Sequence, residues 1–112
     1  MSDSLRLGLA QLNFCVGDID GNTAKIVAAI ETARGPLKID LLAFPELAVT
    51  GYPPEDLLFR PGLHRRVEHA LTVIARSTHG IAVAVGHPEQ TKDDIYNACS
   101  VFCDGKQIAR YR

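Results

Sequence analysis

The stretch Ile39-Asp-Leu-Leu-Ala-Phe-Pro-Glu46 joins a short apolar strand directly to a proline and a carboxylate. A short apolar run bounded by turn signals is typical of a strand buried in a sheet. In α/β folds, active sites lie at the carboxyl ends of such strands. Glu46 therefore has the position of a functional carboxylate, although a surface glutamate capping the next turn would give the same pattern. Composition alone favours that simpler interpretation.

Alternating strands and helices are predicted on both sides of this stretch. Residues 5–12 predict a strand that is apolar or small on both faces, which is typical of burial between layers. Asn22 or Thr23 can cap a following helix, and Gly35 can end it in the left-handed conformation. The apolar residues of this helix recur at helical spacing and predict an inner face of Ile26, Ala29, Ile30 and Ala33.

The second half of the chain predicts another helix and three more strands. The helix spans about residues 64–78 and ends by Gly80, and its inner face is predicted to comprise Val67, Ala70, Leu71 and Ile74. Strands are expected at 81–86, 96–103 and 108–112. Asp104-Gly105 predicts a tight hairpin turn, because both residues tolerate positive φ. Strands that alternate with helices predict an α/β layer fold.

The composition is that of an ordinary globular protein, with 112 residues, 46% hydrophobic and 22% charged, and a net charge of −1. No basic stripe is present, so nucleic-acid binding is not expected. No apolar run is long enough to span a bilayer, and Met1–Ser4 does not begin a secretion signal, so we expect a cytoplasmic protein with no membrane contact. An odd number of cysteines argues against a disulfide framework.

Few other residues lie in a sequence pattern that indicates a catalytic or ligand-binding role. Cys99 and Cys103 share one face of a strand and are expected to be buried as small hydrophobes, and unactivated cysteines are inert. Lys106 follows the hairpin turn and is expected to be solvated, while His64 and His69 are expected on an exposed helix face. The chain has neither the spacing of a common zinc site nor a glycine-rich phosphate loop, so no metal or nucleotide site is predicted in it.

Phe44-Pro-Glu-Leu-Ala-Val-Thr-Gly-Tyr52 resembles the first catalytic motif of the nitrilase superfamily of carbon–nitrogen hydrolases. Other segments resemble that superfamily in the same order. They are Leu9–Asn13, Val16–Asp18, Gly21-Asn22, residues 81–88, Tyr96–Ala98 and Asp104–Lys106. Each segment alone is weak evidence, but their order and spacing are specific. The resemblance implies the N-terminal part of an α-β-β-α sandwich, with residues 5–112 forming a domain truncated on its C-terminal side.

One further segment narrows the resemblance to a smaller group of enzymes within the superfamily. This segment is Gly51-Tyr-Pro-Pro-Glu-Asp-Leu-Leu58. It is similar to the segment after the catalytic glutamate in glutamine-dependent NAD synthetases, although a proline-stiffened loop anchored by Leu57 and Leu58 would also explain it. That family implies glutamine as substrate and a homo-oligomeric protein. It also implies a separate synthetase domain that uses ATP, Mg and deamido-NAD, whereas no cofactor is implied within this segment.

The same resemblance implies a Glu-Lys-Cys triad. In it the Cys thiolate attacks the amide carbonyl, Glu acts as general base, and Lys stabilises the oxyanion. Glu46 is the only triad member that maps onto this sequence, which stops at Arg112 before a matching Lys or Cys. We therefore expect the 112-residue chain alone to be inactive. The alternatives are a stand-alone amidase or carbamoylase, and a non-catalytic module with the same scaffold.

Overall fold

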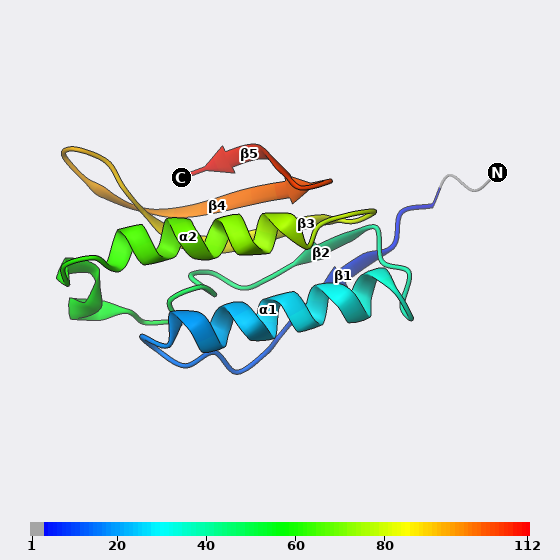
Figure 1. Cartoon of the computed structure of the whole chain (residues 1–112), viewed down its shortest axis with the longest axis horizontal. Helices are drawn as coiled ribbons and strands as arrows, with labels where there is room; N and C mark the ends of the chain where they lie inside the picture. Colours follow the sequence, from blue (N-terminus) through cyan, green and yellow to red (C-terminus); the bar gives the residue numbers. More distant parts are fainter. Residues whose placement is uncertain (1–3) are drawn as a thin grey trace.

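The computed structural model describes residues 4–112, so part of the Met1–Ser4 segment considered above lies outside the described residues. Two helices pack on one side of a five-stranded sheet (Figure 1). The elements in chain order are β1 (Leu7–Leu9), α1 (Ile19–Arg34), β2 (Leu41–Ala43), the 3₁₀ helix η1 (Glu55–Phe59), α2 (Leu63–Arg76), β3 (Ala82–Gln90), β4 (Ile95–Cys103) and β5 (Lys106–Tyr111).

The strands lie in the sheet in the same order as in the chain, from β1 to β5. The pairs β1–β2 and β2–β3 are parallel, and each is connected through a helix, as parallel neighbours require. The pairs β3–β4 and β4–β5 are antiparallel. Asp104 (φ 50°) and Gly105 (φ 81°) form the tight turn between β4 and β5, which confirms the predicted hairpin.

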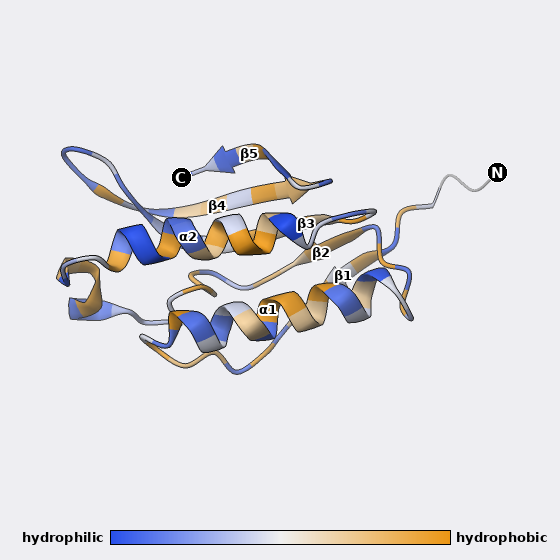
Figure 2. Cartoon of the chain, viewed as in Figure 1, coloured by the Kyte–Doolittle hydropathy of each residue, from blue (hydrophilic) through white to orange (hydrophobic). Residues whose placement is uncertain are grey.

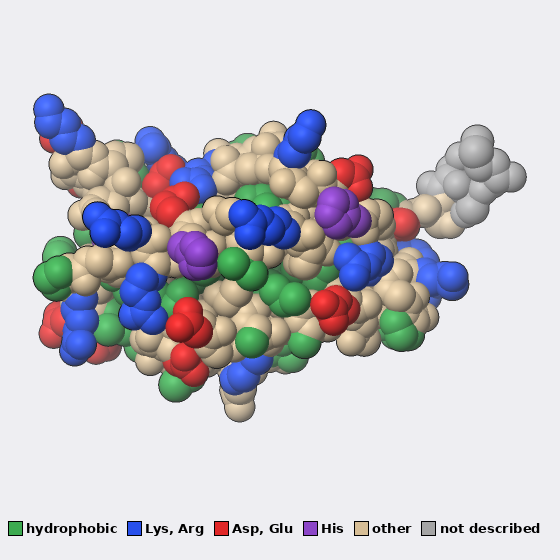
Figure 3. Space-filling model, viewed as in Figure 1, with side chains coloured by type: hydrophobic (Ala, Val, Ile, Leu, Met, Phe, Trp, Pro, Cys, Tyr) green, Lys and Arg blue, Asp and Glu red, His purple; other side chains and the backbone are tan. Residues whose placement is uncertain are grey.

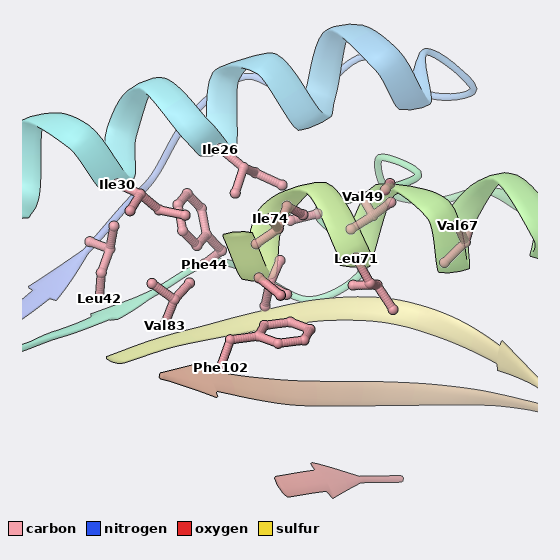
Figure 4. Packing of buried hydrophobic residues seen from close by; sticks show 14 of the residues in the cluster. Ile26, Ile30, Leu42, Phe44, Val49, Val67, Leu71, Ile74, Val83 and Phe102 are labelled. Atoms are coloured by element: carbon pink, nitrogen blue, oxygen red, sulfur yellow. The ribbon is translucent and has the colours of Figure 1, made fainter. Parts of the chain in front are cut away.

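The hydrophobic core lies between the two helices and one face of the sheet (Figure 4). Leu42, Val83 and Phe102 point from three neighbouring strands toward the helices. Both predicted inner faces are confirmed, except that Ala29 is only partly buried. Figure 2 shows that hydrophilic and hydrophobic residues alternate along each helix, as in an amphipathic helix. Full burial of one such side chain contributes roughly 1.5–3 kcal/mol.

The first strand is exposed rather than buried between layers. The side chains of Leu5, Leu7 and Leu9 are 63%, 62% and 78% exposed, respectively. Gly8, which alternates with them, faces the core, where an added Cβ would lie 3.0 Å from Leu42 Cδ1. The prediction of burial on both faces is therefore wrong for the described chain. The reason is that the helices cover only one face of the sheet, and β1 lies at its edge.

Helix α1 begins earlier than predicted. Its N-cap is Asp18, whose Oδ1 accepts a hydrogen bond from Gly21 N at 3.0 Å, and not Asn22 or Thr23, which lie inside the helix. The predicted end at Gly35 is confirmed, but its φ of −83° is not left-handed. A capping aspartate four residues upstream explains the shift, because it satisfies free N–H groups of the first turn.

The second helix and the third strand also differ in length from the prediction. Helix α2 ends at Arg76, and Gly80 (φ 76°) lies in the turn before β3. Strand β3 continues past the predicted end at Gly86 to Gln90. It does so because β4 pairs with it along its full length, from Ala82 opposite Cys103 to Gln90 opposite Ile95.

Charges are mixed on the face seen in Figure 3, where basic and acidic side chains are interspersed over both helices. His69 is exposed as predicted. His64 is half-buried instead, with Nε2 2.9 Å from Leu58 O and Nδ1 buried without a hydrogen-bond partner. Within residues 4–112, neither helix has the length and apolar character needed to cross a bilayer.

Candidate active site

Glu46 lies just beyond the carboxyl end of β2, as predicted. The chain stays beside β3 through Phe44, whose N–H donates to Ala84 O at 2.9 Å. It then turns sharply, with Leu47 at a φ of 52°, and Val49 N returns to β3 at 3.3 Å from Gly86 O. This turn leaves the Glu46 side chain exposed at the end of the sheet.

Gly86 allows the turn to lie directly against β3. A Cβ at this position would lie 2.5 Å from Leu47 N and 2.8 Å from Pro45 O. Both neighbours are backbone atoms on either side of Glu46, so they cannot move aside without moving the carboxylate. A residue with any side chain at position 86 would therefore displace Glu46.

Asn22 holds the residues that follow Glu46 in the same turn. Its fully buried amide donates from Nδ2 to Val49 O at 3.1 Å and to Cys15 O at 2.8 Å, and Oδ1 accepts from Cys15 N at 2.8 Å. Gly17 N also donates to Thr50 O at 2.9 Å. The residue considered as a helix cap thus ties the loop before α1 to the turn after Glu46, a role that the sequence did not reveal.

Asn97 is the direct side-chain partner of Glu46. Its Nδ2 on β4 donates a hydrogen bond to Glu46 Oε1, across 51 positions of the sequence. No spacing rule connects residues so far apart, so only the sheet register brings them together. Glu46 and Asn97 are both exposed, so the described residues do not enclose the carboxylate in apolar surroundings.

Glu46 and Asn97 line a shallow pocket of about 270 Å³. The other lining residues are Phe44, Pro45, Gly86, Ala98, Cys99, Tyr111 and Arg112. Lys106 lies at the opposite end of the hairpin, where it pairs with Cys103. That position is six residues along β4 from Asn97, which corresponds to about 20 Å of strand. Lys106 therefore cannot serve Glu46, and its exposure agrees with the predicted solvation.

The cysteines of the described chain show no activation. Cys99 lines the Glu46 pocket, but partial burial raises the pKa of its thiol and disfavours the nucleophilic thiolate. Cys99 and Cys103 are half-buried, not buried as predicted, because they face the side of the sheet opposite the helices. Cys15 is exposed in the loop before α1. Within residues 4–112, no three His, Cys, Asp or Glu side chains form a group that could hold a metal ion.

A larger hollow of about 610 Å³ lies away from Glu46, between β1, β2 and α1. Its lining is mostly apolar and contains neither a carboxylate nor a thiol. Lys25, its one charged residue, donates from Nζ to Asn13 O at 2.5 Å. The smaller pocket around Glu46 is therefore the better candidate for chemistry, since a reaction needs polar groups that converge.

Comparison with known proteins shows which family this chain resembles. Residues 6–112 match the carbon-nitrogen hydrolase family. The chain is 46% identical over 112 residues to a glutamine-dependent NAD(+) synthetase of Xylella fastidiosa, covering 100% of this chain and 21% of that protein. It is 43% identical over 110 residues to one of Aquifex aeolicus, covering 96% of this chain and 19% of that protein. The chain thus spans about a fifth of the length of these relatives.

Solved structures agree with the sequence comparison. A glutamine-dependent NAD+ synthetase from Acinetobacter baumannii is 36% identical with a TM-score of 0.90, covering 96% of this chain and 20% of that one. An amidase from Nesterenkonia sp. is 25% identical with a TM-score of 0.82, covering 96% and 42%. These likenesses confirm the mixed α/β fold with two helices on one side of the sheet. The chain belongs to the carbon-nitrogen hydrolase family.

Proposed function

We propose that this chain is the N-terminal part of the glutaminase domain of a glutamine-dependent NAD synthetase. The observation that carries the proposal is the 46% identity, over all 112 residues, to a protein of that name. The Gly51–Leu58 segment, which resembles the same enzymes, supports it. The whole protein would be a cytoplasmic homo-oligomer. It would release ammonia from glutamine and use it, with ATP and Mg at a separate domain, to convert deamido-NAD to NAD.

Glu46 is the proton acceptor in this proposal. It takes the proton from a cysteine thiol that attacks the amide carbonyl, and it then gives that proton to the departing ammonia. It next takes a proton from the water that hydrolyses the thioester, and returns it to the thiol. Asn97 holds Oε1, which leaves Oε2 to face the reacting groups. The thiol and the oxyanion-binding lysine do not map onto residues of this chain.

The substitution Glu46→Gln in the full-length protein tests this role. Gln keeps the shape of the side chain but loses the proton acceptor, and loss of a general base costs about two to four orders of magnitude in rate. We expect glutamine-dependent NAD formation to fall by that factor, while synthesis from added ammonium is spared because it bypasses the thioester. Equal loss of both activities in a folded protein would remove Glu46 from the role.

A stand-alone amidase is the second candidate, and the fold shared with the Nesterenkonia amidase favours it. The gene sequence beyond Arg112 separates the candidates. A Ser-Gly-Gly-x-Asp-Ser pyrophosphatase loop in a second domain supports the synthetase, and a stop after one hydrolase domain supports the amidase. If no Lys and Cys occur at the matching downstream positions, the chain belongs to a non-catalytic module.

A further inference from the structure

A row of polar side chains, buried on β3 and β4 and half-buried on β5, crosses these strands on the face that meets the helices. His87 on β3 is fully buried, with Nε2 2.7 Å from Ser100 Oγ on β4. Arg110 on β5 donates from Nε to the same Oγ at 3.0 Å. His87 Nδ1 lies 2.9 Å from Pro88 O. Side-chain hydrogen bonds thus join the three strands in addition to their backbone pairing.

The hydrogen-bond partners determine the protonation state of His87. Pro88 O can only accept, so Nδ1 must carry a hydrogen. Arg110 Nε can only donate, so Ser100 Oγ accepts from it and donates its own hydrogen to His87 Nε2. The ring is therefore neutral, with Nε2 as an acceptor. A proton on Nε2 would leave the Ser100 hydroxyl facing two donors, with its own hydrogen unpaired among buried groups.

Charged groups reach His87 from three packed elements, namely Glu68 on α2, Glu89 on β3 and Arg110 on β5. Burial is the main cause that lowers the pKa of His87. The hydrogen bond to Pro88 O and the two glutamates raise it and Arg110 lowers it, and the net pKa lies below the ordinary 6.5. Arg110 is itself held by Glu68 at 3.3 Å and by Glu89 at 3.0 Å. The electrostatic surroundings thus agree with the neutral ring that the hydrogen bonds require.

The same row of side chains reaches the Glu46 pocket through β5. Glu89 accepts from Arg110 on one oxygen at 3.0 Å and from Arg112 Nε on the other at 2.7 Å. The guanidinium of Arg112 also lies 4.4 Å from the centroid of the Tyr96 ring. Arg112 lines the pocket beside Glu46. The contacts of Arg110 and Arg112 therefore set where the end of β5 lies relative to the carboxylate.

We propose that His87, Ser100 and Arg110 form a positioning relay, which holds the end of β5 against the Glu46 pocket only while His87 is neutral. The catalytic part of this inference rests on the proposed function, but the structural part does not. The relay residues touch no reacting atom and act through β5. Protonation of His87 would make Nε2 a second donor to Ser100 Oγ and leave the Ser100 hydrogen unpaired, which would loosen residues 110–112, so turnover would fall while substrate affinity changed little.

The first test measures the strand itself in the full-length protein. Ser100→Ala removes the shared hydroxyl, and Ser77→Ala is the matched control, because its hydroxyl bonds only Ile74 O at the end of α2. Hydrogen–deuterium exchange is followed in the peptide that covers residues 106–112. We expect Ser100→Ala to speed this exchange about fivefold to tenfold, as loss of one hydrogen bond would, and Ser77→Ala to leave it unchanged.

The second test measures the consequence for the reaction. We expect Ser100→Ala to lower kcat for glutamine about 10- to 100-fold, as a small misplacement of a site does, with little change in KM. His87→Gln keeps an acceptor oxygen for Ser100 and cannot take up a proton. The ratio of its kcat to that of the unchanged protein at pH 8 is taken as the reference. The ratio of the two kcat values should then rise in favour of the variant as the pH falls below 6.5.

Two results would overturn the relay. One is a Ser100→Ala protein whose β5 exchange matches that of Ser77→Ala. The other is a ratio of His87→Gln to unchanged kcat that stays flat as the pH is lowered from 8 to the lowest value at which both proteins remain folded. A full-length protein that hydrolyses no glutamine would contradict the proposed function separately, and the exchange measurement would then decide for or against the relay by itself.

Discussion

Asn97 holds Glu46 through an amide N–H that can be removed without changing the shape of the side chain. Asn97→Asp places a second carboxylate against Glu46, and the repulsion between like charges turns this proposed general base out of position. We expect kcat for glutamine hydrolysis to fall about 10- to 100-fold with KM changed much less. Steady-state kinetics of the full-length protein measure both constants, and a kcat equal to that of the unchanged protein would show that Glu46 does not depend on Asn97.

A second prediction concerns Gly86. A Cβ added at this position would lie less than 3 Å from two backbone atoms. Gly86→Ala should destabilise the protein by about 1–3 kcal/mol, as overpacking does, and should also lower turnover by shifting Glu46. Gly62→Ala is the control, since its φ of 80° strains a side chain but no atom lies within 4 Å. Thermal unfolding compares the two. A fully active Gly86→Ala protein would contradict the close approach.

The sequence predicted Glu46 but neither of its supporting residues. Glu46 follows an apolar strand and a proline directly, and such local signals can be recognised without knowing the fold. Asn97 and Gly86 act on Glu46 through the pairing of β3 with β4 and of β2 with β3. Register between distant strands is not encoded in any short window, so these contacts appear only in the structure.

At the scale of elements, Asn22 joins the start of α1 to the turn after Glu46. Asn22→Ala removes three hydrogen bonds and leaves the buried Val49 O without this partner, so we expect a loss of about 2 kcal/mol. Asp18→Ala removes only the N-cap of the same helix and should cost about 1 kcal/mol. Urea unfolding ranks the two variants. A smaller loss for Asn22→Ala would mean that water replaces its contacts.

The type of each element, helix or strand, was easier to predict from the sequence than what covers it. The inner face of α2 followed from helical spacing, which a single segment displays completely. Burial of β1 did not follow, because a strand that is apolar on both faces does not reveal whether a second layer covers it. The extent of β3 was underestimated because β4 supports it as far as Gln90.

At the scale of the whole molecule, His87 links folding stability to pH. Its pKa in the folded protein is lowered from the ordinary 6.5, so the unfolded chain binds the proton more readily. The stabilisation is complete above about pH 6.5 and decreases as the pH falls from there through the folded pKa. Urea midpoints of the unchanged protein and of His87→Gln should therefore diverge between pH 7 and pH 5.

Glu89 acts in a lower pH range than His87, which separates the contributions of these two residues to stability. Hydrogen bonds from Arg112 and Arg110 lower the pKa of Glu89 from its ordinary 4.5, so its contribution is lost only at still lower pH. A loss of stability between pH 7 and pH 5 that persisted unchanged in His87→Gln would exclude His87 as its source.

The strands lie in the sheet in the order in which they are synthesised, and this affects how the chain can fold on the ribosome. Among β1 to β5, each new strand leaving a ribosome finds its preceding neighbour already synthesised, and none of these five strands has to insert between two that are already paired. The β3–β4–β5 meander also closes through short connections, which favours fast folding. The sheet can thus grow during translation from the β1 edge toward β5. The part of the pocket formed by Asn97 and Arg112 would then be added to a Glu46 turn that is already built.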